Sequence, residues 1–322
     1  MQETQPDQEP RERAVVSATE VPTNWLMGRN GLRDGWRLVL YLLMVMILAA
    51  AIGAGIHLLH HATGVTVPSG PPSALELASQ EILSFALVFG VALLMSRIEH
   101  RPVGAYGLPA SGLLGTKFWI GFVVGLVEVC LLVGLIRLFG GYSFGSLALS
   151  GGGIIGWGAF HLLLFFFVGL FEEFLFRGYT QFTLAEGIGF WPAAILLSVG
   201  FGAVHLGNAG EGPVGAASVV LVALLFCFSL KRTGNLWFAV GLHASFDWGE
   251  TFLFSTPNSG LVMQGHLSNS LLHGPRWLTG GTIGPEGSVF CFLTMGLQFL
   301  VVAMLFPANK PVPREAEDLA VS

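Results

Sequence analysis

The sequence predicts an all-α, polytopic membrane protein with about eight transmembrane helices. Of its 322 residues, 53% are apolar and only 11% are charged, whereas charged residues make up about 25% of an ordinary globular chain. Several apolar runs of about 17 to 20 residues carry almost no charge, and helices of that length span a hydrocarbon core of about 30 Å. An ordinary water-soluble domain is therefore excluded.

Apolar runs bounded by charge, glycine or proline mark the expected helices in order. The expected spans are 38–56, 75–96, 118–136, 156–186, 190–206, 214–230, 235–254 and 289–306. None of these runs alternates polar with apolar residues as a membrane β-strand would. The fourth exceeds one crossing, so it is either strongly tilted or has a C-terminal part, from about Gly178, that lies at the interface.

The remaining segments have the composition of tails and loops. Residues 1–24 and 307–322 are expected to be disordered cytoplasmic tails. They flank a membrane domain at 25–306, whose motif core is 156–254. The segment 255–288 is rich in Gly, Pro, Ser and Asn and is expected to be a long loop over the membrane face.

The distribution of charge predicts the orientation and the partners. The formal net charge is −5, so the chain lacks the basic excess that holds nucleic acid, and only membrane lipid and substrate are expected as partners. If the N-terminus is cytoplasmic, Arg137 and Arg276 lie on the outer side of the membrane and Arg177 lies within a span. The other 12 of the 15 basic residues then lie on the cytoplasmic side. This asymmetry predicts an integral protein of the plasma (inner) membrane with both termini in the cytoplasm.

Ionisable side chains in an apolar helix are costly, so each is a candidate functional residue. The densest group comprises Glu172, Glu173 and Arg177, which stand among aromatic residues. Glu173 and Arg177 are four residues apart and can pair along one helix face, whereas Glu172 projects about 100° away. Glu172 is thus available for chemistry, unless the three charges only neutralise one another and fix helix packing.

His205 lies in the next apolar segment. A single histidine in such a helix is often only a packed core residue. The turn between the two segments is centred near Ile188, and Glu172 lies 16 residues before it and His205 17 residues after it. In an antiparallel hairpin both lie roughly 25 Å along their helices from that turn, so the two side chains can face each other.

His243 and Asp247 are four residues apart in the 235–254 segment and share a helix face. An ordinary structural His–Asp pair is the alternative reading of this spacing. Together the three segments could offer a glutamate, two imidazoles and an aspartate to one cavity. That combination is suited to activating a water molecule and stabilising an oxyanion.

Three motifs therefore follow one another: Glu-Glu-x-x-x-Arg from Glu172, Phe-x-x-x-His ending at His205, and His-x-x-x-Asp from His243. In this order they resemble the CAAX protease and bacteriocin-processing family of intramembrane glutamic endopeptidases, also called the Abi family. The resemblance covers about 156–254. It implies an enzyme that hydrolyses a peptide bond in a peptide or membrane-protein substrate.

The resemblance also implies a role for each residue. Glu172 with His205 would activate a water, His243 and Asp247 would stabilise the oxyanion, and Glu173 and Arg177 would support the site. Family members with Asn at the last position have an amide that can donate to the oxyanion. Asp247 can donate only when protonated, or it can orient His243 instead.

Three alternatives stay open. No HExxH motif or CxxC pair is present, and no metal or cofactor is expected, although a metal bridging Glu172, His205 and His243 is conceivable. The chain could also be a non-catalytic membrane scaffold or immunity protein of the same fold. An ion-coupled transporter is a further possibility, because intramembrane carboxylates carry protons or ions in such proteins.

The orientation is testable by cysteine labelling in intact cells. An impermeant thiol reagent added outside should not label Arg232→Cys or Arg314→Cys, because both positions are expected in the cytoplasm. Arg276→Cys, expected outside, serves as the positive control. Labelling of Arg232→Cys or Arg314→Cys would reject the orientation.

Overall fold

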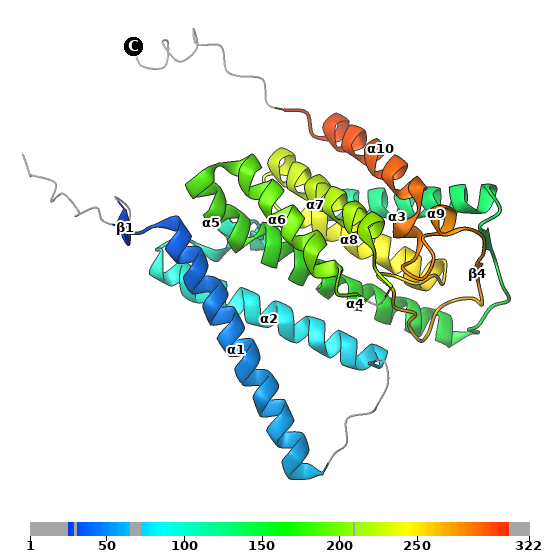
Figure 1. Cartoon of the computed structure of the whole chain (residues 1–322), viewed down its shortest axis with the longest axis horizontal. Helices are drawn as coiled ribbons and strands as arrows, with labels where there is room; N and C mark the ends of the chain where they lie inside the picture. The colour runs from blue at the N-terminus through cyan, green and yellow to red at the C-terminus, as the bar shows by residue number, and fades with distance from the viewer. Residues whose placement is uncertain (1–24, 29–30, 65–71, 209, 309–322) are drawn as a thin grey trace, which may run out of the picture.

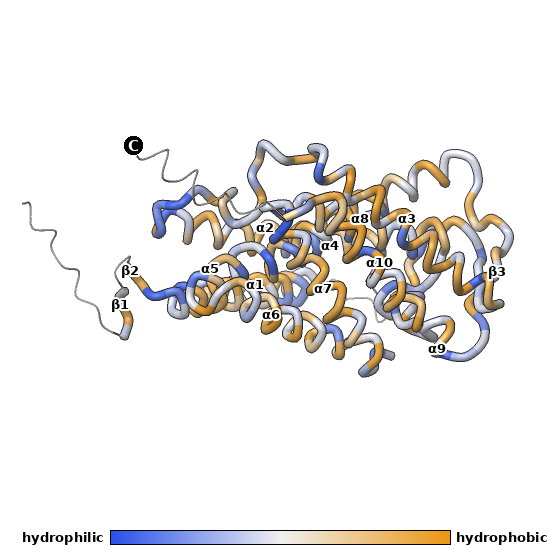
Figure 2. The backbone as a smooth tube through the Cα atoms, turned by 90° about the horizontal axis from the view of Figure 1, so that it is seen from above, coloured by the Kyte–Doolittle hydropathy of each residue, from blue (hydrophilic) through white to orange (hydrophobic). Residues whose placement is uncertain are grey.

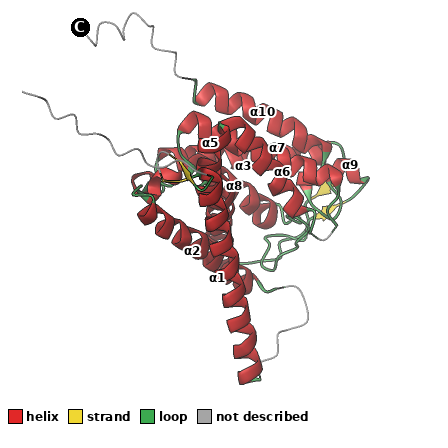
Figure 3. Cartoon of the chain, turned by 60° about the vertical axis from the view of Figure 1, so that its left-hand side comes forward, coloured by secondary structure: helices red, strands yellow, loops and turns green. Residues whose placement is uncertain are grey.

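The computed structural model describes residues 25–28, 31–64, 72–208 and 210–308, and this part of the chain is built almost entirely of helices (Figures 1 and 3). The predicted N-terminal tail, 1–24, lies outside the described residues. Of the predicted C-terminal tail, 307–322, the residues 309–322 lie outside them as well. The longer helices are α1 (Asp34–Thr63), α2 (Ala74–Ile98), α3 (Thr116–Leu138), α4 (Gly152–Arg177), α5 (Tyr179–Ile188), α6 (Phe190–His205), α7 (Pro213–Thr233), α8 (Trp237–Trp248) and α10 (Val289–Leu305).

Short elements complete the described chain. They are the strands β1 (Met27–Gly28), β2 (Gly31–Leu32), β3 (Tyr142–Ser143) and β4 (Leu271–Leu272), the turns η1 (Val103–Tyr106), η2 (Ala110–Gly112) and η4 (Pro285–Gly287), the π-helical turn η3 (Gly249–Leu253), and α9 (Arg276–Thr279). The strands form two antiparallel pairs, β1 with β2 and β3 with β4.

The all-α, polytopic membrane fold predicted from the sequence is confirmed. Among the described residues, α1, α2, α3, α7 and the α4–α5 stretch are long and apolar enough to cross a membrane, and α6 and α10 are shorter apolar helices. Figure 2 shows that hydrophobic residues run along most of each helix. Each expected span overlaps helical structure: the span 156–186 covers most of α4 and α5, and the span 235–254 contains α8 followed by η3.

The irregularity expected in the fourth segment lies at Gly178, between α4 and α5. A Cβ atom there would lie 2.3 Å from the carbonyl oxygen of Phe174, so no larger residue fits without a shift of the backbone. The turn predicted near Ile188 is also present. Gly189 has a φ of 87°, and the chain reverses there from α5 into α6.

α8 is the buried central helix, and it packs tightly against α3. A Cβ atom on Gly121 of α3 would lie 2.1 Å from the carbonyl oxygen of Phe238, and one on Gly241 of α8 would lie 2.1 Å from that of Phe118. Small residues at a crossing let two helix backbones approach closely. On the neighbouring face, Gly169 of α4 lies against Val240 and His243. α8 is therefore fixed between α3 and α4.

The 255–288 segment is anchored to one end of the helix bundle. β4, within this segment, pairs with β3, which follows α3, in the register Tyr142 to Leu272. The Tyr142 hydroxyl also donates a hydrogen bond of 2.9 Å to the carbonyl oxygen of Phe254. The segment thus forms a defined cover over the ends of α3 and α8.

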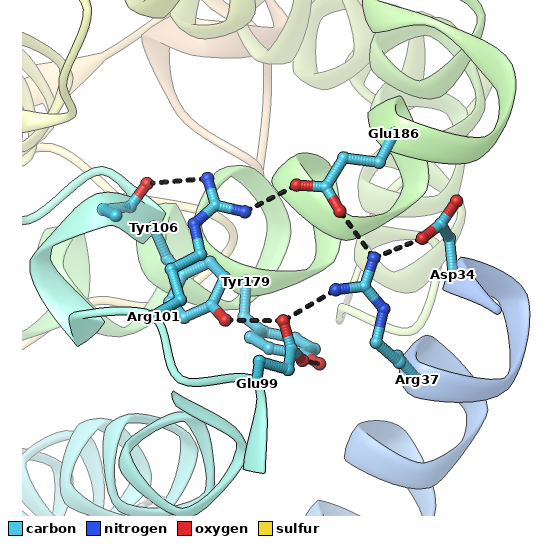
Figure 4. Close-up of polar contacts among 8 residues, drawn as sticks. Asp34, Arg37, Glu99, Arg101, Tyr106, Tyr179 and Glu186 are labelled. Atoms are coloured by element: carbon cyan, nitrogen blue, oxygen red, sulfur yellow. Dashed lines mark hydrogen bonds and ion pairs between the residues drawn. The ribbon is translucent and has the colours of Figure 1, made fainter. Parts of the chain in front are cut away.

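α1 is held near its first turn by a polar cluster (Figure 4). Arg37 pairs with Glu99 at 2.8 Å and with Glu186 at 2.5 Å. The hydroxyls of Tyr106 and Tyr179 donate to Glu99. Only 6% of the most apolar stretch of α1 is buried, so this cluster, together with the packing of Tyr41, attaches the helix to the rest of the chain.

Loss of this attachment should lower stability. Arg37→Met should decrease the free energy of unfolding by about 1–3 kcal/mol, because Glu99, whose side chain is only 6% exposed, loses its cation. Arg101→Met is the matched control. Its 2.5 Å pair with Glu186 is more exposed, so it should cost less than about 1 kcal/mol. Unfolding in detergent measures both, and an equal loss would contradict the assignment.

Candidate active site

A cavity of about 380 Å³ lies within the helix bundle. Its lining includes Glu172 from α4, His205 from α6, and His243 and Asp247 from α8. The structure thus places side chains from three separate segments at one cavity.

Glu172 and Glu173 are adjacent in α4 but occupy different environments. The Glu172 side chain is 24% exposed and its Oε2 lies 3.7 Å from Nε2 of His243. The Glu173 side chain is fully buried. The difference follows from the rotation of about 100° between successive residues of a helix. Glu172 therefore faces the cavity, while Glu173 points into the protein.

Glu173 connects Arg177 with His243. Its Oε1 accepts hydrogen bonds from Nη1 of Arg177 at 3.2 Å and from Nδ1 of His243 at 3.1 Å. The predicted pairing of Glu173 with Arg177 along α4 is thus present. Because an ionised carboxylate can only accept, Nδ1 of His243 carries a proton in this arrangement. The other ring nitrogen, Nε2, is left to face Glu172 and Asp247.

Two phenylalanines link the buried Arg177 to both histidines. The guanidinium lies over the ring of Phe201, 4.3 Å from its centroid, and 5.5 Å from that of Phe226. The Phe201 ring in turn lies 4.5 Å from the His205 ring, and Phe226 stacks on His243 at 5.4 Å with 9° between the planes. These contacts offset part of the cost of burying the guanidinium and restrict both imidazoles.

His205 is the last residue of α6, and its Nδ1 lies 2.8 Å from the carbonyl oxygen of Phe201. A carbonyl oxygen cannot donate, so Nδ1 carries the proton of this hydrogen bond. When the ring is neutral, Nε2 is consequently an acceptor, which is the form that a proton-accepting histidine requires.

Asp247 lies one helical turn after His243, and its Oδ2 is 3.4 Å from His243 Nε2. The imidazole is thus flanked by Glu173 at one nitrogen and by Glu172 and Asp247 at the other.

The cavity is also lined by polar residues that do not belong to the three motifs. They are Gln80, Glu81, Glu128, Asn208, Ser218, Asn258, Ser259 and Glu286. Three of them lie in the 255–288 segment. There the backbone N–H of Ser259 donates to Glu286 at 2.6 Å, and burial, followed by the nearby Asp247 carboxylate, raises the pKa of Glu286 to about 8. No periodic pattern marks these loop residues in the sequence.

A bridging metal would need at least three ligand side chains that converge on one point. Within the described part of the chain, no three His, Cys, Asp or Glu side chains converge closely enough to hold a metal ion. Glu172, His205 and His243 line one cavity without forming such a ligand set.

One family of known proteins matches part of this chain. The model of a family described as Type II CAAX prenyl endopeptidase Rce1-like matches residues 154–249. The matched region runs from α4 to the first residue of η3 and contains all three motifs. The resemblance expected from the motifs is confirmed, and it supports a protease role for this membrane protein. No curated protein and no solved structure matched the chain.

Proposed function

We propose that this chain is an intramembrane endopeptidase in which Glu172 and His205 activate a water molecule to hydrolyse a peptide bond. The observation that carries the proposal is the convergence of Glu172, His205, His243 and Asp247 on one cavity, with the Glu173–Arg177 pair buried behind it. The substrate is a peptide or membrane protein. The enzyme acts in the plasma (inner) membrane with both termini in the cytoplasm, and no cofactor is invoked.

The reaction begins with general base catalysis. Glu172 takes a proton from a water that His205 Nε2 helps to hold, and the water oxygen attacks the carbonyl carbon of the peptide bond. The electron pair of the carbonyl double bond moves to its oxygen and gives a tetrahedral oxyanion. Protonated Glu172 then gives its proton to the amide nitrogen as the carbon–nitrogen bond breaks, which releases an acid and an amine.

The oxyanion needs donors that are already in place. His243 Nε2 supplies one when the ring is doubly protonated, and Asp247 supplies a second when its carboxyl group is protonated. Glu173 and Arg177 do not touch the substrate. They are positioning residues, because Glu173 holds Nδ1 of His243 and Arg177 holds Glu173.

Glu172→Gln should abolish peptide hydrolysis, with a loss in kcat of at least about 10²–10⁴, while the protein stays folded. Glu81→Gln is the matched control, since it removes another carboxylate of the same cavity and should keep most of the activity. The measurement is cleavage of a peptide by the purified protein in detergent.

Activity equal to wild type in Glu172→Gln would refute the catalytic assignment. Activity that a chelator removes and zinc restores would indicate a metal mechanism instead. Absence of proteolysis in the wild-type protein would favour a scaffold or immunity function, and ion flux in liposomes without proteolysis would favour a transporter.

Asp247→Asn tests the role of Asp247. Glu173 already orients His243, so we expect the donor role. The amide of Asn is then a permanent donor, and the variant should retain activity and lose less of it towards high pH than wild type. The measurement is the pH dependence of kcat/KM for both proteins. A folded variant that is inactive across the pH range would instead indicate that an ionised Asp247 orients the imidazole.

A further inference from the structure

Phe226 of α7 is an aromatic residue of the cavity wall that belongs to none of the three motifs. Its ring lies nearly parallel to the imidazole of His243, with 5.4 Å between the centroids and 9° between the planes. The side chain is 2% exposed and packs in a core cluster with Phe238 and Leu242 of α8. Because the ring is held in this cluster, its face stays directed at the imidazole.

The two nitrogens of the same imidazole meet carboxylates. Glu173 lies 3.1 Å from Nδ1, and Glu172 and Asp247 lie 3.7 Å and 3.4 Å from Nε2. These contacts are in the plane of the ring nitrogens, whereas Phe226 covers a face of the ring. His243 is therefore surrounded by groups that suit a ring with two protons and a positive charge. The proposed oxyanion donor is this form of the ring.

Further titratable or charged groups lie around His243 on neighbouring helices. They are Glu81 of α2, Arg177 of α4 and His205 of α6. α7 has its charged residues, Lys231 and Arg232, in its last turn, and it presents the ring of Phe226 to His243. The contribution of α7 at this point is thus an aromatic face and no formal charge.

An aromatic face distinguishes the two protonation states of an imidazole. A cation within about 6 Å of a ring centroid is attracted by the negative face of the ring, and a neutral imidazole lacks this attraction. Arg177 shares the Phe226 ring, with its guanidinium 5.5 Å from the centroid. The charge of Arg177 is the same in both states, so it weakens the preference for doubly protonated His243 without removing it.

The second phenylalanine treats the second histidine differently. Phe201 lies 4.5 Å from the ring of His205, but the two planes are tilted by 57°. The same Phe201 ring has the guanidinium of Arg177 over it at 4.3 Å. A cation already at this ring opposes a second positive charge beside it. His205 is therefore placed to remain neutral, as the proposed role of its Nε2 as an acceptor requires.

We propose that Phe226 is a positioning residue for the oxyanion donor: its ring orients His243 and stabilises the doubly protonated imidazole by a cation–π interaction. This inference rests on the proposed function, because it concerns the protonation state of the donor at Nε2. When the carbonyl oxygen of the substrate becomes negative, the Nε2 proton is then already in place. Phe226 acts through His243 and not on the reacting atoms.

Fluorination of the Phe226 ring tests the interaction with little change of shape, because fluorine weakens the negative face. Mono-, di- and trifluorophenylalanine are placed at position 226 of the full chain in detergent. The titration of His243 is followed by nitrogen-15 NMR of labelled histidine, with His243→Gln to identify its signal. The titration midpoint should move to lower pH with each fluorine, by about 0.5 pH unit in total.

Peptide cleavage supplies the second readout. The alkaline limb of the pH profile of kcat/KM should move by the same amount, while the plateau at lower pH stays unchanged. A merely structural role would lower the plateau instead. Phe226→Leu, which removes the ring, should give at least the shift of the trifluoro variant, and unfolding in detergent confirms that it is folded.

Phe165 is the matched control position. It is also 2% exposed and lines the same cavity, but its ring contacts His161 and not the histidines of the candidate site. The same three fluorinated residues at position 165 should leave both the titration of His243 and the alkaline limb unchanged. A shift of His243 as large as that from position 226 would contradict a local ring interaction.

A His243 midpoint that stays constant along the fluorinated series at position 226 would overturn the proposal. A shifted midpoint with an unchanged alkaline limb would also overturn it, because His243 protonation would then not govern turnover. The proposed function fails separately, through absence of peptide cleavage by the wild-type protein. The titration needs no substrate, so it distinguishes that failure from the absence of a cation–π interaction.

Discussion

The buried pair of Arg177 and Glu173 is the interaction on which the candidate site depends. Neither side chain is exposed, and removing one partner would leave an uncompensated charge inside the bundle. The oxygen of Glu173 that receives Arg177 also receives His243, so one carboxylate joins the end of α4 to the middle of α8. The same guanidinium contacts the rings of Phe201 and Phe226. These rings in turn pack against His205 and His243, respectively.

The hydrogen bond between His243 and Glu173 can form only because the backbones of α4 and α8 are close. Gly169 brings α4 against α8 beside His243, and Gly121 and Gly241 bring α3 against α8 on another side. A larger residue at Gly121 or Gly241 would displace α8 from α3 and disturb the position of His243 relative to Glu173. The polar geometry of the site is therefore set by glycines that carry no chemistry of their own.

The helices and the membership of the site could be predicted from the sequence because both follow from regular spacing. The i,i+4 relation gives the Glu173–Arg177 and His243–Asp247 pairs, and equal distance from the Ile188 turn puts Glu172 and His205 at similar depth. The hydrogen bond from His243 to Glu173 could not be predicted, because it depends on how closely α4 and α8 cross. Nor could Asn258 and Glu286, because side chains of an irregular segment follow no period.

The cavity wall is formed partly by helices and partly by the irregular 255–288 segment. Its motif residues stand on helices locked by close crossings, whereas Asn258, Ser259 and Glu286 stand on the segment anchored by β3 and β4. Replacement of a helical wall residue disturbs a packed core, but replacement on the covering segment leaves the helix crossings intact. The part of the cavity lining that stands on the covering segment can thus vary in sequence while the helical part stays fixed.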